Sequence, residues 1–265
     1  MRRVTSNELL DEDLGTPAEV ARSLDDLWRM NRWLGGVSSS LRMIDDLPSS
    51  TPTRSLRILD VGAGDGRLAA RLRDELRERG IRVDFFVLDL RLAHLQNGDP
   101  VRADLRPVVA DALRLPFAER SFDVVMCNLF FHHFSHEKAT GLLRALAQIA
   151  SRAVLVNDLE RHWVPYLFIR SAFMFTRSRV TRHDAPASVR QAYTREEFAG
   201  LAAAAGFTSF KVRRLIPFRL GLTLWKSGGG SSIPGGPEVL PSANQLEGRP
   251  SNSELESRRQ NAVTD

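Results

Sequence analysis

Apolar residues from position 56 onward fall into two kinds of stretch. Short, nearly continuous apolar stretches read LRILDVG, IRVDFFVLDL, RPVVAD, FDVVMCN and RAVLVND, a pattern typical of strands buried on both faces. Longer stretches between them carry apolar residues at helical spacing, such as Leu68, Leu72 and Leu76 in the stretch 67–80. Strands that alternate with helices predict an α/β fold whose sheet is doubly wound and mostly parallel.

Helical signals precede this alternation. Thr16, Pro17 and Glu19 have the form of a capping box with proline at the first helical position, and the predicted helix ends at Gly35-Gly36. A second short helix fits 37–47, followed by the linker PSSTPT. We therefore expect residues 1–50 to form an N-terminal helical extension, which begins with a loose acidic leader over 1–15.

The pattern changes after residue 158. Residues 159–180 are predicted to be an aromatic helical stretch and 181–193 a loop. Thr194 and Glu197 form a second capping box before a predicted helix, and two strands follow around Pro217. The sheet should thus have seven strands in a domain over 51–226, with a helical insert at about 159–193 before the last two strands. The tail, 227–265, is rich in Gly, Ser, Pro, Asn and Glu and is predicted to be disordered.

Composition indicates the cellular compartment and limits the kinds of binding partner to expect. Cys127 is the only cysteine, so no disulfide forms within one chain. The most apolar run, WVPYLFIRSAFMF, is short for a membrane span and contains Arg170, and the N-terminus lacks a secretory signal pattern. These features favour a cytoplasmic protein. The basic residues are spread among the acidic ones despite a pI near 10.1, which indicates a mixed-charge surface and no nucleic-acid partner.

The strongest candidate site is the glycine loop LDVGAGDGR, residues 59–67, between a predicted strand and a predicted helix. Backbone N–H groups and the helix dipole face a polar ligand at such a junction, and glycines allow close approach. The dinucleotide fingerprint would put its third glycine at 67, where this chain has Arg67. The loop therefore favours another cofactor class over NAD(P), although an NAD(P) oxidoreductase stays as an alternative.

The form Asp-x-Gly-x-Gly-x-Gly resembles the first motif of class I, Rossmann-like methyltransferases that use S-adenosylmethionine (SAM). Further motifs follow in the family's order: Asp89 at the end of the second strand, VVADALRLPF at 108–117, and SFDVVMCN at 121–128. This resemblance covers about 56–158 and, more loosely, 194–225. It implies SAM as the cofactor and methyl transfer to a small molecule as the activity.

The resemblance also implies cofactor contacts. Asp60 would orient the loop and reach the methionine amino group through water, Asp89 would accept the ribose hydroxyls, and Asp111 would accept the adenine amino group. A helix cap at Asp89 and a turn at Asp111 are the plain structural alternatives. The full cofactor-binding set is Asp60, Gly62, Ala63, Gly64, Gly66, Asp89, Leu90, Asp111, Ala112 and Asn128.

Two adjacent histidines follow the fourth predicted strand in CNLFFHHF. The stretch resembles the LHH loop of small-molecule methyltransferases, with His133 aligned to the family's usual histidine. A phenol or alcohol acceptor needs a base with a pKa near neutrality, which favours His133 as the base and leaves His132 for packing or for fixing the loop. His183 and Asp158 are the other catalytic candidates. The prolines that nucleobase methyltransferases carry after this strand are missing, which disfavours that activity.

The insert should build the acceptor pocket. Its apolar side chains suit an aromatic or lipid-like acceptor, although a helix packed on the sheet would use the same residue types. Nearby arginines, including Arg170 and Arg182, allow peripheral contact with a membrane. The expected pocket residues are Trp163, Tyr166, Leu167, Phe168, Phe173, Met174 and Phe175.

Three further stretches suggest a narrower resemblance. MNRWLGG (30–36), NDLER (157–161) and SRVTRHDAPASVRQAYT (178–194) resemble a bacterial methyltransferase group associated with type III polyketide synthases and phenolic lipids. This resemblance implies a polyketide-derived phenol as the acceptor, with transfer to oxygen or ring carbon. His183 and Asp184 would then lie in a loop that closes over the acceptor.

No metal site is expected. Asn128, Asn157 and Asp158 offer one carboxylate and two amides, a poor set for Mg²⁺. Adjacent residues such as His132 and His133 are expected to point in different directions, which disfavours zinc. A protein of the same fold without catalysis, with Trp28 and Trp33 serving a partner, is the alternative from another functional class. The oligomeric state does not follow from the sequence.

Overall fold

A computed structural model describes residues 1–4, 8–10, 15–47, 55–96, 104–172, 176 and 178–226. The expected linker at 48–53 and the expected disordered tail at 227–265 lie outside these residues. Phe173, Met174 and Phe175 of the insert also lie outside them. The predicted boundary between an extension and a main domain near residue 50 stays a prediction.

The sheet has seven strands in the order β3-β2-β1-β4-β5-β7-β6. Every neighbouring pair is parallel except the two pairs that involve β7. The predicted mostly parallel seven-stranded sheet is therefore confirmed. The strands are β1 (Ser55–Val61), β2 (Arg82–Asp89), β3 (Arg106–Val109), β4 (Phe122–Asn128), β5 (Ala150–Leu159), β6 (Phe210–Leu215) and β7 (Arg219–Trp225).

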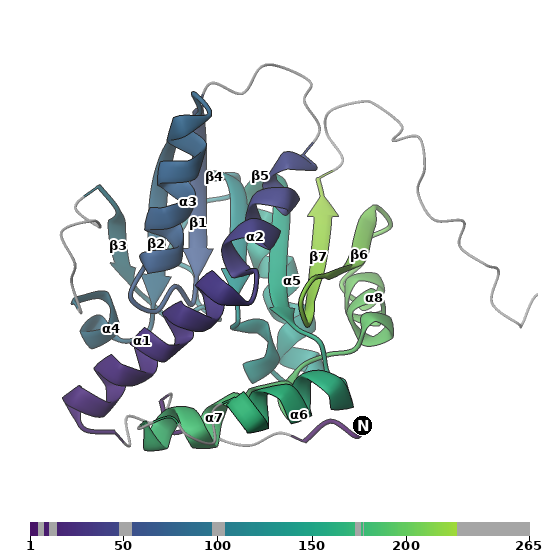
Figure 1. Cartoon of the computed structure of the whole chain (residues 1–265). Coiled ribbons are helices and arrows are strands. Elements are labelled where there is room, and N and C mark those ends of the chain that lie inside the picture. The colour runs from purple at the N-terminus through teal and green to yellow at the C-terminus, as the bar shows by residue number, and fades with distance from the viewer. Residues whose placement is uncertain are drawn as a thin grey trace, which may run out of the picture. The chain divides into compact units, whose positions relative to one another are not determined.

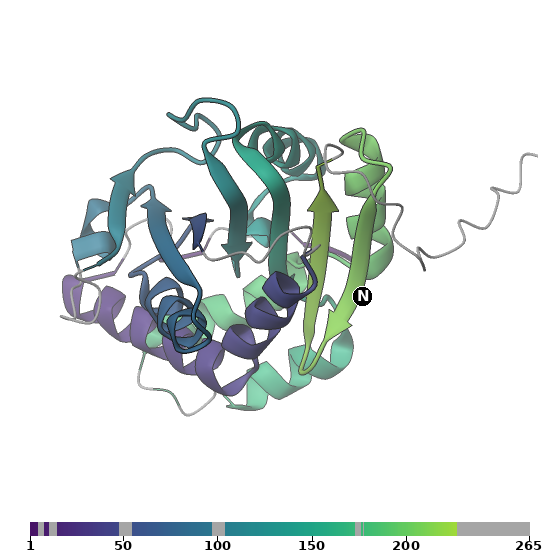
Figure 2. The same cartoon turned by 90° about the horizontal axis from the view of Figure 1, so that it is seen from above.

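Helices cover both faces of the sheet (Figures 1 and 2). Apolar side chains of α2 (Gly36–Asp45) and α3 (Arg67–Glu78) pack with one face, and those of α5 (His136–Ile149) and α8 (Arg195–Ala204) pack with the other. The remaining helices are α1 (Pro17–Trp33), α4 (Leu92–Gln96), α6 (Trp163–Ala172), α7 (Arg179–Gln191) and the 3₁₀ turn η2 (Phe131–His133). None of these described helices is both long and apolar enough to span a membrane.

The local start signals of the helices are confirmed. Thr16 and Thr194 each accept a hydrogen bond from the backbone N–H of the third residue of their helix. The side chains of those third residues, Glu19 and Glu197, in turn accept from the backbone N–H of the cap residue. Ser135 caps α5 in the same manner, accepting from the backbone N–H of Lys138. These caps satisfy N–H groups that a helix start otherwise leaves unpaired. The sequence therefore placed the starts at Thr16 and Thr194 correctly.

The loop predicted at 181–193 is wrong, because most of this stretch forms α7. Ser178 caps it by accepting the Thr181 N–H, and Pro186 lies inside the helix. Proline removes one backbone donor, which is why the stretch reads as a loop. Val180 and Val189 are fully buried on the inner face of α7. Burial of that face outweighs the local cost of the proline.

The carboxyl ends of the parallel strands form one edge of the sheet, and α1, α6 and α7 lie across this edge (Figure 1). The loop after β1, the end of β2 and the turn after β4 all open there. Ligands bind in the crevice at this edge in open α/β sheets. The arrangement therefore brings the predicted motifs to one place beneath α1 and α7.

Candidate functional site

The glycine loop between β1 and α3 has backbone angles that would be strained in residues other than glycine. Gly62, Gly64 and Gly66 have φ values of 71°, 59° and 76°, in the left-handed region that glycine tolerates best. Gly66 is the N-cap of α3, and the loop leads directly into the helix N-terminus. The loop therefore presents backbone N–H groups at a positive helix end, as a polar ligand requires.

Gly62 also allows a close contact with Phe130. A Cβ built on Gly62 would lie 2.3 Å from the Phe130 ring. Phe130 follows β4, so this contact joins the loop after β1 to the turn that carries the two histidines. The glycine thus serves packing between two parts of the site as well as loop geometry.

We expect Gly62→Ala to lower the free energy of unfolding by about 2 kcal/mol or more, because strain at positive φ adds to a clash with Phe130. Gly141→Ala is the matched control, since Gly141 lies inside α5 with nothing near its absent Cβ. Alanine there should be neutral or stabilising by up to about 1 kcal/mol. Denaturant unfolding of both variants measures the difference, and equal stabilities would contradict the contact.

Asp89 ends β2 and is buried beside the loop. Its carboxylate accepts N–H groups of Gly64 at 2.9 Å and Arg91 at 2.9 Å, and it lies 3.2 Å from Nδ1 of His94. These bonds fix the carboxylate at the wall of a cavity. The structure thus places Asp89 where the resemblance implies a ribose contact, and it adds His94 as a neighbour that the sequence did not indicate.

Asp60 is buried at the end of β1. Its Oδ1 has no hydrogen-bond partner among the described residues, and burial together with the charge of Asp89 raises the pKa of Asp60 to about 7. An unpaired carboxylate oxygen in such a position favours a cation nearby. The methionine ammonium of SAM is a group of this kind, so the donor set fits the cofactor that the resemblance implies.

The third predicted motif lies at the other rim of the same cavity. Asp111 is exposed and accepts the Leu113 N–H at 2.8 Å, while Ala112 is buried. This hydrogen bond shows that Asp111 stabilises a turn, which was the structural alternative to an adenine contact. Its position at the cavity rim leaves the adenine contact as a prediction.

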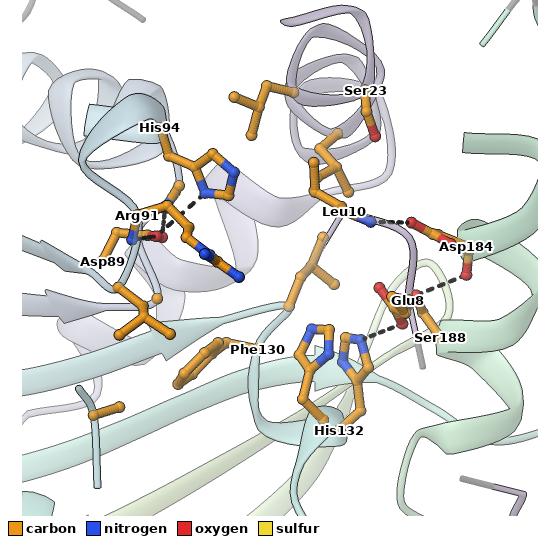
Figure 3. Close-up of a pocket in the computed structure, with 18 of the residues that line it drawn as sticks. Glu8, Leu10, Ser23, Asp89, Arg91, His94, Phe130, His132, Asp184 and Ser188 are labelled. Carbon is orange, nitrogen blue, oxygen red and sulfur yellow. Dashed lines mark hydrogen bonds and ion pairs between the residues drawn. The ribbon is translucent and has the colours of Figure 1, made fainter. Parts of the chain in front are cut away.

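One cavity of about 320 Å³ joins these motifs to the two histidines (Figure 3). Its first part is lined by predicted cofactor residues. Its second part has apolar walls from α1 and neighbouring segments, with polar groups gathered at one end. The lining includes Gly62, Gly64, Asp89, Leu90, Asp111 and Ala112 in the first part, and Leu10, Leu24, Leu27, Met30, Leu129, Leu159 and Ala185 in the second.

His132 and His133 lie together in η2 at the polar end of the cavity. His132 is buried, and its Nδ1 lies 2.7 Å from Oδ1 of Asp158 and its Nε2 3.5 Å from Glu8. Burial alone would lower the pKa of His132, but Asp158 and then Glu8 outweigh it and raise that pKa to about 10. The two carboxylates thus favour the protonated form of His132. The bonds from Asp158 to the ring and to the backbone N–H of His132 agree with a role in fixing the turn.

The reason given against zinc at the two histidines is wrong. Their rings are 4.3 Å apart between centroids and tilted by 30°, so they point the same way. Ligand atoms of Glu8, His132 and His133 all lie within 4.8 Å of one another, and these three residues could hold a metal ion. The competing Mg²⁺ set is unsuitable, because Asp158 is bonded to His132 and both asparagine amides have protein partners.

Asn128 does not line the cavity, contrary to its predicted cofactor role. Its Nδ2 donates to Asn31, and its Oδ1 accepts from Arg219 at 2.9 Å. The register pairs Asn128 with Asn157, which donates to Ser39 and Ser40 of α2. These amides fasten α1 and α2 to the sheet. Asp60, Ala63 and Gly66 also lie outside the lining. Ala63 and Gly66 belong to the loop itself, and a contact of Asp60 with the cofactor ammonium would pass through water, as the resemblance implies.

The remaining catalytic candidates differ in position. Asp158 is buried behind His132 and also accepts the backbone N–H groups of His132 and Leu159, so it positions that ring. His183 lies on α7 outside the cavity lining, with its Nδ1 2.7 Å from Asp184. The predicted closing loop around His183 and Asp184 is therefore wrong, because both residues belong to a helix.

The acceptor wall also differs from the prediction. Trp163, Leu167 and Phe168 of α6 are 60%, 50% and 43% exposed and do not line the cavity. The apolar wall comes instead from the inner face of α1, whose helical spacing was visible in the sequence. Glu8 and Ser188 also line the cavity. No local sequence signal distinguished them, since Glu8 lies in an acidic leader and Ser188 in a stretch that reads as a loop.

Comparisons with known proteins agree with this geometry. Residues 58–152 match the family described as "Methyltransferase domain". A demethylmenaquinone methyltransferase of Beutenbergia cavernae is 33% identical over 112 residues, which is 42% of this chain and 44% of that protein. The chain thus matches less than half the length of this curated relative.

Solved structures support the fold. The plantazolicin methyltransferase BamL has a TM-score of 0.60 at 15% identity, over 80% of this chain and 97% of that chain. A SAM-dependent methyltransferase from Aquifex aeolicus has a TM-score of 0.54 at 15% identity, over 80% and 98%. The chain therefore has the class I methyltransferase fold, and its residues 58–152 are similar to the methyltransferase domain family.

Proposed function

We propose that this protein is a SAM-dependent methyltransferase whose acceptor is a hydrophobic small molecule with a hydroxylated aromatic ring. The observation that carries the proposal is the single cavity that joins the glycine loop and Asp89 to the two histidines. Cofactor and acceptor can meet in such a cavity with little water between them, and alignment of the reacting groups accounts for much of the acceleration. The predicted enzyme class agrees with the matched methyltransferase domain.

The residues at the first part of the cavity fit the cofactor. The glycine-loop N–H groups, the Asp89 carboxylate and the unpaired Asp60 oxygen offer donors and acceptors for the polar ends of SAM. When bound, SAM supplies a methyl group on a positively charged sulfur. The buried carboxylates favour that positive charge, and the apolar lining excludes water from it.

The second part of the cavity fits the acceptor. Side chains such as Leu24, Leu27 and Met30 offer apolar walls for a ring. Glu8, His132 and Ser188 form one polar cluster in the same lining. This distribution suits a molecule with an apolar body and one hydrogen-bonding edge. The relative named demethylmenaquinone methyltransferase supports an acceptor of this class. Polyketide-derived phenols and alkylquinols belong to the same class, with transfer to oxygen or ring carbon.

His133 is the proposed proton acceptor. It lines the cavity next to Phe130, whereas His132 already holds its proton between Asp158 and Glu8. A base must reach the acceptor from the cavity wall, and His133 is the less buried of the two histidines, which favours His133 over His132. The absence of a proline pair after β4 supports a small-molecule acceptor over a nucleobase.

The test is transfer of label from methyl-labelled SAM to a panel of phenolic lipids, alkylquinols and polyketide phenols. We expect at least one to be methylated, and His133→Ala to lower kcat by about 100- to 10,000-fold, since general-base catalysis contributes about that much. His136→Ala, an exposed change at the start of α5, is the control that should keep the wild-type rate. Transfer that survives in His133→Ala but is lost in His183→Ala would show that His183, and not His133, is the base. A panel without product would favour a non-catalytic protein.

A further inference from the structure

The N-terminal segment, residues 1–4 and 8–10, is bound to the site and is not the loose leader that the sequence predicted. Arg3 donates from Nη2 to the carbonyl oxygens of His132 at 2.9 Å and Phe134 at 2.7 Å, and from Nε to Gln191 at 2.6 Å. Its guanidinium also lies 4.1 Å from the ring centroid of Tyr193. One arginine thus fastens the segment to the turn that carries both histidines.

A second attachment holds the segment at its other side. The buried carboxylate of Asp184, on α7, accepts the backbone N–H groups of Leu9 and Leu10, each at 3.0 Å. Leu10 lines the cavity, so these bonds place an apolar side chain of the segment in the acceptor part. The segment is therefore fastened both at η2 and at α7, with the cavity between them.

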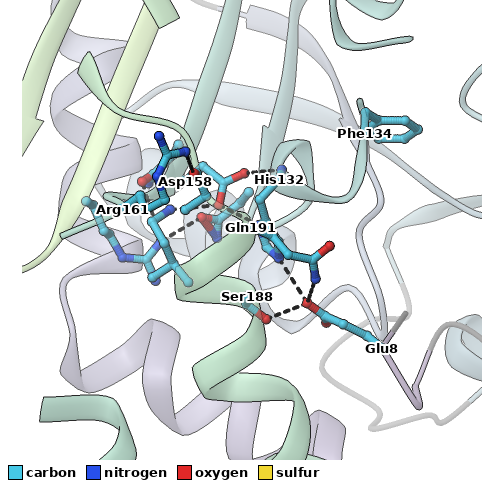
Figure 4. Close-up of polar contacts among 12 residues, drawn as sticks. Glu8, His132, Phe134, Asp158, Arg161, Ser188 and Gln191 are labelled. Atoms are coloured by element: carbon cyan, nitrogen blue, oxygen red, sulfur yellow. Dashed lines mark hydrogen bonds and ion pairs between the residues drawn. The ribbon is translucent and has the colours of Figure 1, made fainter. Parts of the chain in front are cut away.

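Glu8 lies between these attachments and is only 7% exposed (Figure 4). Its Oε1 accepts Ser188 Oγ at 2.6 Å and Gln191 Nε2 at 3.0 Å, and lies 3.5 Å from Nε2 of His132. That nitrogen is buried without a hydrogen-bond partner among the described residues. Glu8 is thus the group that faces the second nitrogen of His132, opposite Asp158.

The charges around His132 agree with this arrangement. Burial would raise the pKa of Glu8, but His132 and His133 lower it below its ordinary value. The charged or titratable groups that face His132 are Asp158 from β5, Glu8 from the N-terminal segment and the neighbouring His133, while Arg3 binds its carbonyl oxygen. An imidazolium between two carboxylates has one preferred ring orientation, and the His133 ring lies 4.3 Å from it.

We propose that the N-terminal segment is the cover of the acceptor cavity, and that Glu8 is a positioning residue that fixes His132 and, through it, His133. The inference rests on the proposed function of this cavity. Glu8 and Leu10 form part of the lining, so an acceptor in the second part of the cavity would contact the segment. The segment there excludes water from the acceptor and keeps a negative charge next to His132.

The test compares Glu8→Gln with Glu137→Gln, an exposed change on α5 away from the cavity. Histidine side-chain NMR measures the ¹⁵N chemical shift of His132 Nε2, which should change only in Glu8→Gln, because Glu8 lies 3.5 Å from that nitrogen. The value of kcat/KM for the acceptor should fall by about 10- to 100-fold, since small misplacements of catalytic groups cost that much. SAM affinity should stay unchanged in both variants.

Arg3→Gln is the second variant and tests the cover. We expect faster amide hydrogen exchange at Leu9 and Leu10 than in the wild type, with the same stability of the sheet. Fast exchange at both amides in the wild type would overturn the proposal that the segment covers the cavity. A His132 Nε2 chemical shift or a kcat/KM that Glu8→Gln leaves at the wild-type value would overturn the positioning role. If the wild type binds SAM but methylates no acceptor, the proposed function fails, and the chemical shift of His132 Nε2 still decides whether Glu8 contacts that nitrogen.

Discussion

Asp89→Ala is expected to abolish stabilisation of the protein by SAM or S-adenosylhomocysteine. The variant loses a buried carboxylate that would accept two ribose hydroxyls, and each such charge-assisted bond contributes about 1.5–3 kcal/mol. Affinity should therefore fall by at least about 100-fold. At a ligand concentration of about 100 Kd, the wild type gains about 2.7 kcal/mol, and the variant should gain almost nothing. Thermal unfolding with and without ligand measures both values.

The matched control is Asp84→Ala on the same strand. Asp84 is partly exposed and pairs with Arg106 at the surface, so its removal should leave the ligand-induced shift intact. Asp89→Asn keeps the side-chain shape and one carbonyl oxygen for the Gly64 N–H, and should give an intermediate affinity. Equal ligand shifts in Asp89→Ala and the wild type would exclude Asp89 as the ribose contact.

Asp158→Ala is expected to lower the free energy of unfolding by about 3–5 kcal/mol, the usual cost of breaking a buried ion pair from one side. Its carboxylate accepts Nδ1 and the backbone N–H of His132 as well as the N–H of Leu159. All three donors would lose a buried partner. Urea unfolding measures the change, with Asp123→Ala as control, because Asp123 accepts only an exposed bond from the Arg57 N–H and its loss should cost under about 1 kcal/mol.

The pH dependence of this difference has a defined sign. Asp158 has a lowered pKa, so its contribution is present above 3.8 and is lost as the pH falls through its folded pKa. His132 has a raised pKa, so its contribution is present below 6.5 and is lost as the pH rises toward 10. The stability difference between wild type and Asp158→Ala should thus be largest between about pH 4 and 6.5. A difference that grows from pH 7 to pH 10 would contradict the ion pair.

The parts of the fold that follow local rules were predictable. Continuous apolar strands, the Thr16 and Thr194 capping boxes and the glycine loop each carry their structural cause within a few residues. Asp89 and the Asp111-Ala112 motif reached the cavity because parallel strands end at one edge of the sheet.

The errors arose where a distant segment decides the structure. Pro186 favours a loop locally, whereas Val189 of α7 packs in a cluster with Met30 of α1 and Ile169 of α6, which stabilises the helix. Asn128 was predicted to contact the cofactor, but its side-chain oxygen accepts a hydrogen bond from Arg219, which lies 91 residues away in the chain. Such partners leave no local pattern in the sequence.

The acceptor part of the site depends most on distant segments. Glu8 meets Ser188 and Gln191 across about 180 positions of the chain, and α1 supplies the apolar wall expected from α6. The orientation of the two histidine side chains was predicted wrongly for the same reason. Their spacing suggested diverging side chains, whereas the 3₁₀ turn brings the rings together and Asp158 fixes one of them.

Calorimetric titration of the full chain with S-adenosylhomocysteine tests the central claim most directly, because it needs no knowledge of the acceptor. The glycine loop, the carboxylates of Asp60 and Asp89 and the shared cavity predict saturable binding at one site per chain. They also predict that NADH neither binds nor competes. Absence of binding by S-adenosylhomocysteine, or its displacement by NADH, would contradict the account.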